Sequence, residues 1–184
     1  RKAIEEALKE KPELGKEMIS VVFFQDDGLK RSQQMFSDLN KNAVKPTKSL
    51  NILYDHRDEF YRFVVGLVNS IPVFENRVEM EKTTLSNRSS KAFTLNGIAD
   101  ATLKLLGLGK TRKITKNDEQ LVVEFWNTVS ENIPEWQILY KGEVVPSELR
   151  KNFVNTNTNL LNALGIAGRL LIAEFPDTWQ SKLK

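Results

Sequence analysis

The sequence predicts an α+β fold that is mostly helical, with a small sheet in the N-terminal part of the chain. An almost continuous apolar run at residues 19–24 is typical of a strand buried on both faces, and a shorter run at residues 50–53 predicts a second strand. Over most of the remaining chain, apolar residues recur at helical spacing. With 184 residues, the chain is long enough to bury one sizeable core.

Composition narrows the functional classes. Hydrophobic residues make up 40% of the chain and charged residues 28%, as in ordinary globular proteins, and no apolar run approaches the ~18 residues of a membrane span. We therefore expect a cytoplasmic protein without a membrane partner. The absence of cysteine excludes disulfides and thiolate chemistry, and a single histidine, His56, excludes a histidine-rich metal site in this chain. We expect no cofactor and no metal.

The N-terminal part reads as helix, strand and helix. Strong helix formers fill residues 2–11, and Pro12 and Gly15 end that helix before a strand that starts at Met18. Asp27 is expected to cap an amphipathic helix over residues 29–43. The polar face of this helix is either simply solvated or a surface for nucleic acid or for another domain of the protein.

The second predicted strand starts at Ser49 and leads into a polar tetrapeptide, residues 55–58. This cluster of Asp, His, Arg and Asp resembles a catalytic site, but a helix start explains it better. Asp55 is placed to cap the following apolar helix, and Asp58 favours its first turn through the helix dipole.

The most asymmetric charge distribution lies between residues 82 and 116, which hold eight basic residues and one acidic residue, Asp100. A helix over residues 94–107, stopped by Gly107, separates two basic loops. Serine, threonine and asparagine accompany the first loop and are side chains that contact phosphate beside Arg and Lys. The second loop either contacts phosphate or is a solvated charge run.

The segment 107–111, GLGKT, resembles the end of a phosphate-binding P-loop. The pattern requires glycine at position 104, which is lysine, and a strand before the loop, where a helix is predicted. We therefore reject a P-loop at this position.

The C-terminal part is predicted to be helical, with one extended piece. Thr115 or Asn117 caps a helix that ends before Pro134, and residues 135–145 read as a short strand that turns at Lys141 and Gly142. Buried helices follow Pro146. Gly165 and Gly168 permit a close helix contact, which we expect with the helix of residues 117–132 or in a dimer interface.

The segment QQMFSDLNKNAVKPTKSLNILYDHRD, residues 33–58, resembles the DGQHR-domain family of DNA phosphorothioation systems. Arg1 is similar to the last residue of that family's motif, so the resemblance implies the C-terminal portion of a longer protein. It further implies that residues 1–72 belong to a ParB-like α/β domain, whose remnant supplies the sheet, and that residues 73–184 form a mainly helical region. The implied role is a DNA-binding transcriptional regulator of a phosphorothioation gene cluster.

The expected partners are double-stranded promoter DNA, other phosphorothioation proteins and a second copy of the chain. The predicted nucleic-acid-binding residues are Arg88, Lys91, Lys110, Arg112, Lys113 and Lys116. A possible secondary polar surface comprises Arg1, Gln33, Gln34, Lys41, Lys45 and Lys48. Two alternatives remain open: a ParB-like nucleotide hydrolase or nuclease completed by residues that precede Arg1, and a docking module for other DNA-modification proteins.

Overall fold

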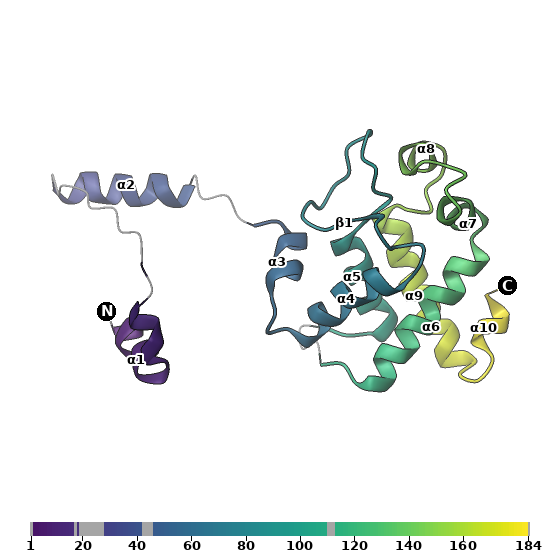
Figure 1. Ribbon diagram of the computed structural model, residues 1–184, viewed down its shortest axis with the longest axis horizontal. Coiled ribbons are helices and arrows are strands. Elements are labelled where there is room, and N and C mark those ends of the chain that lie inside the picture. Colours follow the sequence, from purple (N-terminus) through teal and green to yellow (C-terminus); the bar gives the residue numbers. More distant parts are fainter. Residues whose placement is uncertain (1, 17, 19–27, 42–45, 110–112, 184) are drawn as a thin grey trace. The chain divides into compact units, whose positions relative to one another are not determined.

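The computed structural model describes residues 2–16, 18, 28–41, 46–109 and 113–183. The chain divides into two compact units, Arg1–Val44 and Lys45–Lys184 (Figure 1). None of the helices in the described ranges is long and apolar enough to cross a membrane.

The first unit contains helix α1 (Lys2–Glu10), the short 3-10 helix η1 (Pro12–Lys16) and helix α2 (Leu29–Lys41). Both predicted helices are confirmed, and Pro12 ends α1 because proline lacks the amide hydrogen that the helix ladder needs. On the exposed face of α2, the Gln34 Nε2 donates to Asp38 Oδ1 at 2.8 Å. Most of the strand predicted from Met18, and its break at Asp27, lie outside the described residues.

The second unit is mostly helical with a small sheet, as predicted. The sheet lies later in the chain than the pair of strands predicted from Met18 and Ser49: it is a parallel pair of very short strands, β1 (Val78–Glu79) and β2 (Phe93–Thr94). Val78 lies opposite Phe93, and Glu79 lies opposite Thr94. The helices are α3 (Lys48–Tyr54), α4 (Glu59–Ser70), α5 (Leu95–Leu106), α6 (Lys116–Asn132), α7 (Pro134–Tyr140), α8 (Pro146–Asn152), α9 (Thr158–Glu174) and α10 (Trp179–Lys182).

The strand predicted to start at Ser49 is wrong, because this segment forms helix α3. The Thr47 hydroxyl caps the helix by accepting a hydrogen bond from the Leu50 N–H at 3.2 Å. Ser49 and Ile52 are both buried, and their spacing of three places them on one helical face. The short apolar run therefore follows a helical period.

The extended piece predicted at residues 135–145 is also wrong, because it begins with helix α7. Pro134 ends α6 and occupies the first turn of α7, where its missing amide hydrogen costs nothing. Trp136 and Leu139 are buried at a spacing of three, and the predicted turn follows at Gly142, which has a φ of 75°.

Two predicted helix caps differ in outcome. Asp58, and not Asp55, caps α4, since its carboxylate accepts from the Tyr61 N–H at 3.2 Å. Asp55 instead follows α3 and accepts from the Arg57 N–H at 3.3 Å. For α6 the predicted Thr115 cap is confirmed, with a reciprocal capping box formed by Asp118.

The core of the second unit is built around edge-to-face aromatic rings. The ring centroid of Phe74 lies 5.0 Å from that of Phe93, 5.6 Å from Trp126 and 5.9 Å from Trp136. All four rings are fully buried. Since Phe93 belongs to β2, this aromatic cluster anchors the strand that precedes α5.

Helices α5 and α9 lie side by side and run parallel (Figure 1). Three pairs of residues approach one another in the same order along both helices: Gly97 and Thr158, Ala101 and Gly165, and Gly107, the C-cap of α5, and Arg169. A Cβ at Gly165 would collide with the Ala101 carbonyl, so this glycine permits the close contact that was predicted. The neighbour is mainly α5; α6 contributes Phe125, on which Gly168 packs.

Candidate nucleic-acid interface

The first predicted basic segment is an irregular loop, residues 82–91, in the connection between β1 and β2. Its sequence, KTTLSNRSSK, carries three basic residues and no acidic residue. Ser86, Asn87, Arg88 and Ser90 are exposed, and the loop projects from the helical body (Figure 1). This loop concentrates positive charge and hydrogen-bond donors at one end of the second unit.

Arg150 of α8 holds this loop through four backbone carbonyls. Its Nη2 donates to Ser86 O at 2.8 Å and to Asn87 O at 3.3 Å. Its Nη1 donates to Ser89 O at 3.2 Å and to Lys91 O. Burial lowers the pKa of the Arg150 guanidinium below its ordinary value, but arginine starts so high that it stays charged at neutral pH. We call this arrangement the Arg150 clamp.

Bonds within the loop tighten the turn around Arg88. The Ser89 N–H donates to Ser86 O at 3.0 Å, and the Lys91 N–H donates to Ser89 Oγ at 3.1 Å. Lys91 is half-buried, and its Nζ donates to Asn76 O at 2.8 Å. Of the two predicted phosphate-binding residues in this loop, Arg88 is therefore presented to solvent while Lys91 is tied back to the protein.

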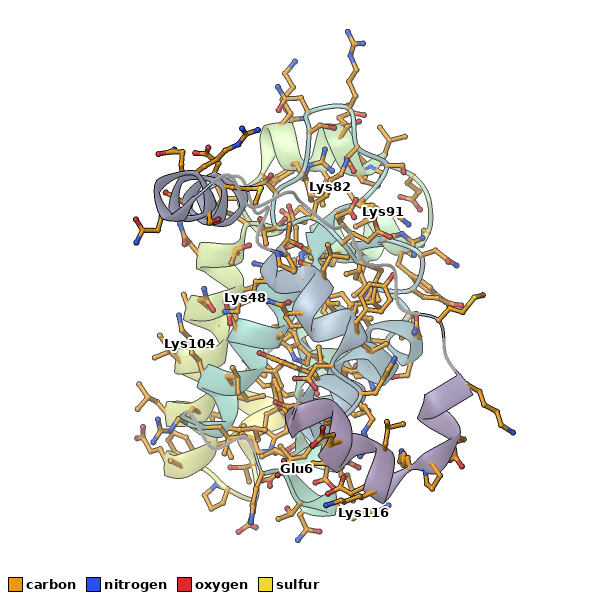
Figure 2. All side chains as sticks on the ribbon, turned by 90° about the vertical axis from the view of Figure 1, so that its left-hand side faces the viewer. Glu6, Lys48, Lys82, Lys91, Lys104 and Lys116 are labelled. Carbon is orange, nitrogen blue, oxygen red and sulfur yellow. The ribbon has the colours of Figure 1, made fainter. Side chains whose placement is uncertain are left out.

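The second predicted basic group is separate from the first. Lys113 and Lys116 are exposed just before and at the start of α6, while Lys110 and Arg112 lie outside the described residues. Figure 2 shows Lys116 at the opposite end of the second unit from Lys82 and Lys91. Lys116 also shares a shallow cleft with Glu59 and Glu119. The described members of the two groups do not form one continuous patch.

The residues of the possible secondary surface come from both units of the chain. Gln33 and Gln34 are exposed on α2, in the first unit. The Lys48 Nζ of α3 lies 2.5 Å from Asp100 Oδ1 of α5, and this ion pair partly neutralises the positive charge of the lysine. Arg1 and Lys45 lie outside the described residues, as does the side chain of Lys41, so their role stays a prediction.

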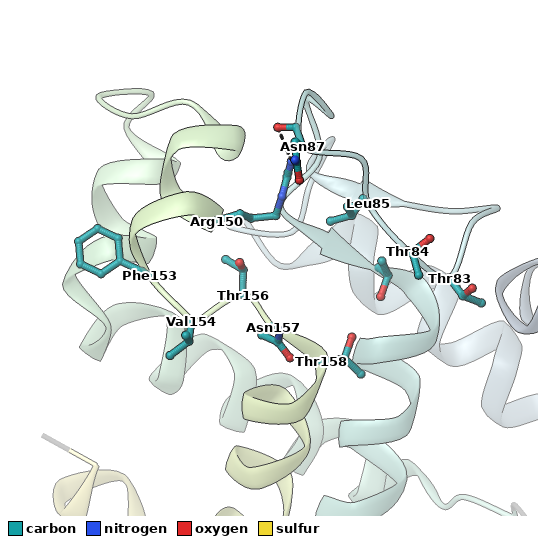
Figure 3. A pocket seen from close by; sticks show the side chains of 11 residues that line it. Thr83, Thr84, Leu85, Asn87, Arg150, Phe153, Val154, Thr156, Asn157 and Thr158 are labelled. Atoms are coloured by element: carbon teal, nitrogen blue, oxygen red, sulfur yellow. Dashed lines mark hydrogen bonds between the residues drawn. The ribbon is translucent and has the colours of Figure 1, made fainter.

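Sequence reasoning missed Arg150 and the cleft beside it. This cleft of about 360 Å³ lies between loop 82–91 and the start of α9 (Figure 3). The clamp joins residues 59 to 64 positions apart, so no local pattern marks it.

His56, which the sequence does not predict to be catalytic, is exposed. Within the described ranges, no three His, Cys, Asp or Glu side chains gather where they could hold a metal ion.

Comparison with known protein families places the chain among proteins that are DNA-sulfur modification-associated. The match covers residues 1–184, the whole chain. The family is DndB, and the chain belongs to it. Comparison with curated proteins and with solved structures gives no match. The predicted relationship to DNA phosphorothioation systems is confirmed at the level of this family, whereas the DGQHR motif at Arg1 stays a prediction.

Proposed function

We propose that this chain binds double-stranded DNA and regulates transcription of DNA sulfur modification genes. The observation that carries the proposal is the Arg150 clamp, which holds an exposed arginine on an acid-free loop in a member of the DndB family. The promoter of these genes is the DNA that such a regulator would bind.

The chemistry of loop 82–91 suits a DNA backbone. The Arg88 guanidinium can donate two parallel hydrogen bonds to one phosphate, and the side chains of Ser86, Asn87 and Ser90 are neutral donors beside it. None of these contacts reads sequence, so base recognition has to come from residues outside this loop.

The clamp gives the loop an advantage in binding. Ordering a mobile loop on DNA costs roughly 1–2 kcal/mol of backbone entropy per residue. Since Arg150 already fixes the carbonyls of Ser86, Asn87 and Ser89, much of this cost is met on folding and not on binding.

The test is a fluorescence-anisotropy titration of the full chain with promoter and scrambled duplexes at several salt concentrations. Each phosphate contact contributes about 0.9 to the negative slope of log affinity against log salt. We expect promoter binding with a steep slope, and Arg88→Ala should make the slope shallower by about 0.9 for both duplexes.

A matched control uses the same change of charge elsewhere. Arg57, which is exposed in the turn between α3 and α4, lies outside loop 82–91. Arg57→Glu should leave binding close to that of the unmodified chain, whereas Arg88→Glu should abolish most of it. Equal losses in both variants would show that net charge alone acts, and no binding to either duplex would refute the proposal.

A further inference from the structure

Helix α9 turns an apolar face to the solvent. Helices α6 and α9 both have 17 residues, but α6 carries five charged residues and α9 carries only one basic and one acidic residue. A helix that is apolar on all sides is normally buried. Yet Ile166 is 49% exposed and Leu170 is 66% exposed, and Figure 2 shows α9, in yellow-green, at the edge of the second unit. This face is therefore of the kind that proteins usually cover.

The exposed residues of α9 form one stripe with the spacing of a coiled coil. The steps between them alternate between four and three residues: Asn159, Ala163, Ile166, Leu170 and Ala173. We call this set the α9 stripe. Gly165 and Gly168, which pack on α5 and α6, lie on the opposite side of the helix. The fold thus buries the glycine face of α9 and leaves a seam for another helix on the other.

The two charges of α9 flank this stripe on opposite sides. Arg169 lies on one flank and Glu174 on the other, and both are exposed. In a parallel pair of helices, a residue on one flank faces the residue five positions later on the other flank of the partner. Arg169 of one copy would therefore face Glu174 of a second copy, and two-fold symmetry would form this ion pair twice.

The charges also select the orientation of the two helices. An antiparallel pair brings like flanks together, so Arg169 and Glu174 of the two copies would not meet. In the single chain the Arg169 guanidinium lies beside Gly107, at the border between α9 and α5, from where a change of rotamer brings it to the partner. Charge complementarity thus favours a second copy of the chain, in parallel orientation, as the occupant of the stripe.

We propose that two copies of this chain associate through the α9 stripe as a parallel helix pair, in which Ile166 and Leu170 pack against their own copies. The alanines of the stripe let the two backbones approach closely, and Asn159 can hydrogen-bond to Asn159 of the second copy. Since α5 packs on one side of α9, the stripe has room for one partner helix. One helix face buries less than the roughly 800 Å² per partner of a standard interface, so we expect a weak dimer.

The experiment is sedimentation velocity of the full chain without DNA, over a range of about 1 to 500 μM, so that its outcome does not depend on the regulatory function proposed above. Leu170→Glu places two carboxylates opposite each other in the seam. The matched control is Val145→Glu, which makes the same change outside α9 at a residue that is 57% exposed. We expect a dimer at high concentration, a dissociation constant at least tenfold higher in Leu170→Glu, and no change in Val145→Glu.

Charge exchange tests the predicted ion pairs. Arg169→Glu and Glu174→Arg should each weaken the dimer, because each places like charges opposite one another, and the double variant should recover most of the loss. Should Leu170→Glu lower the melting temperature, this recovery decides in its place, since a general loss of stability would not be reversed by the second substitution.

A cysteine reports the orientation, since the chain contains none. In the parallel pair, Ala173→Cys lies opposite its own copy and should form an intermolecular disulfide on mild oxidation. In an antiparallel pair that sets Ala173 against Ala163, the two cysteines would lie about 15 Å apart, which is too far for a disulfide. A monomer at every concentration, or a dimer that Leu170→Glu leaves unchanged, would overturn the inference, and a dimer without this disulfide would overturn the parallel pairing.

Discussion

Replacing Arg150 with alanine should release loop 82–91 from the helical body. The side chain donates four charge-assisted hydrogen bonds to backbone carbonyls. Such bonds contribute about 1.5–3 kcal/mol each when buried, but this guanidinium is only part-buried and the four bonds share one side chain. We therefore expect the free energy of opening the loop to fall by about 2–4 kcal/mol in total, while the global free energy of unfolding falls less.

Hydrogen exchange measures this effect directly. The amides of Ser89 and Lys91 are bonded within the loop, and the Ala92 amide donates to Arg77 O at 2.8 Å beyond it. A loss of 2–4 kcal/mol corresponds to about 30- to 700-fold faster exchange at Ser89 and Lys91. The Ala92 amide, which is anchored next to β2, should change much less.

Arg150→Lys separates geometry from charge. Lysine keeps the positive charge, but one ammonium group cannot reach four carbonyls in the positions that the planar guanidinium serves. We expect Arg150→Lys to exchange nearly as fast as Arg150→Ala, and to weaken DNA binding in the same way as loss of Arg88. Unchanged protection of Ser89 and Lys91 in either variant would refute the clamp as the element that orders the loop.

Further predictions concern stability and can be measured by urea denaturation. Gly165→Ala should destabilise the protein by about 2 kcal/mol or more, since the new Cβ would collide with the Ala101 carbonyl, which is part of the α5 backbone. Gly66→Ala, with open space around it in α4, should instead stabilise by about 0.5–1 kcal/mol; equal effects at both glycines would contradict the parallel packing of α5 on α9. Thr115→Ala removes the capping box of α6 and should cost about 1 kcal/mol, whereas an unchanged midpoint would mean that Asp118 alone suffices.

Helices with long amphipathic patterns and clear end signals were predictable from the sequence. The stop of α5 at Gly107, in the left-handed conformation at φ 64°, and the Thr115 cap of α6 follow directly from local chemistry. The short apolar runs were not predictable, since a run of four or five residues fits either period. In α3 and α7 the choice was made by Thr47 and Pro134, which start helices, and by burial at a spacing of three.

The candidate site was predictable only in part. The charge pattern marked loop 82–91 and Arg88, because charge is visible in the sequence itself. It also suggested that residues 82–116 act together, but α5 separates the two basic groups and the tertiary fold ties Lys91 to Asn76. The Arg150 clamp and the parallel arrangement of α5 and α9 arise from contacts between distant segments, which composition and periodicity do not encode.

The aromatic core has a consequence for spectroscopy. All three tryptophans and all three tyrosines of the chain lie in Lys45–Lys184, and Trp126 and Trp136 stack with ring centroids 6.5 Å apart. Tryptophan and tyrosine emission therefore reports on the second unit alone, because the aromatic residues of Arg1–Val44 are all phenylalanine. Since the chain contains no cysteine, a single cysteine introduced on α2 would carry a dye at one defined position and make the first unit visible independently.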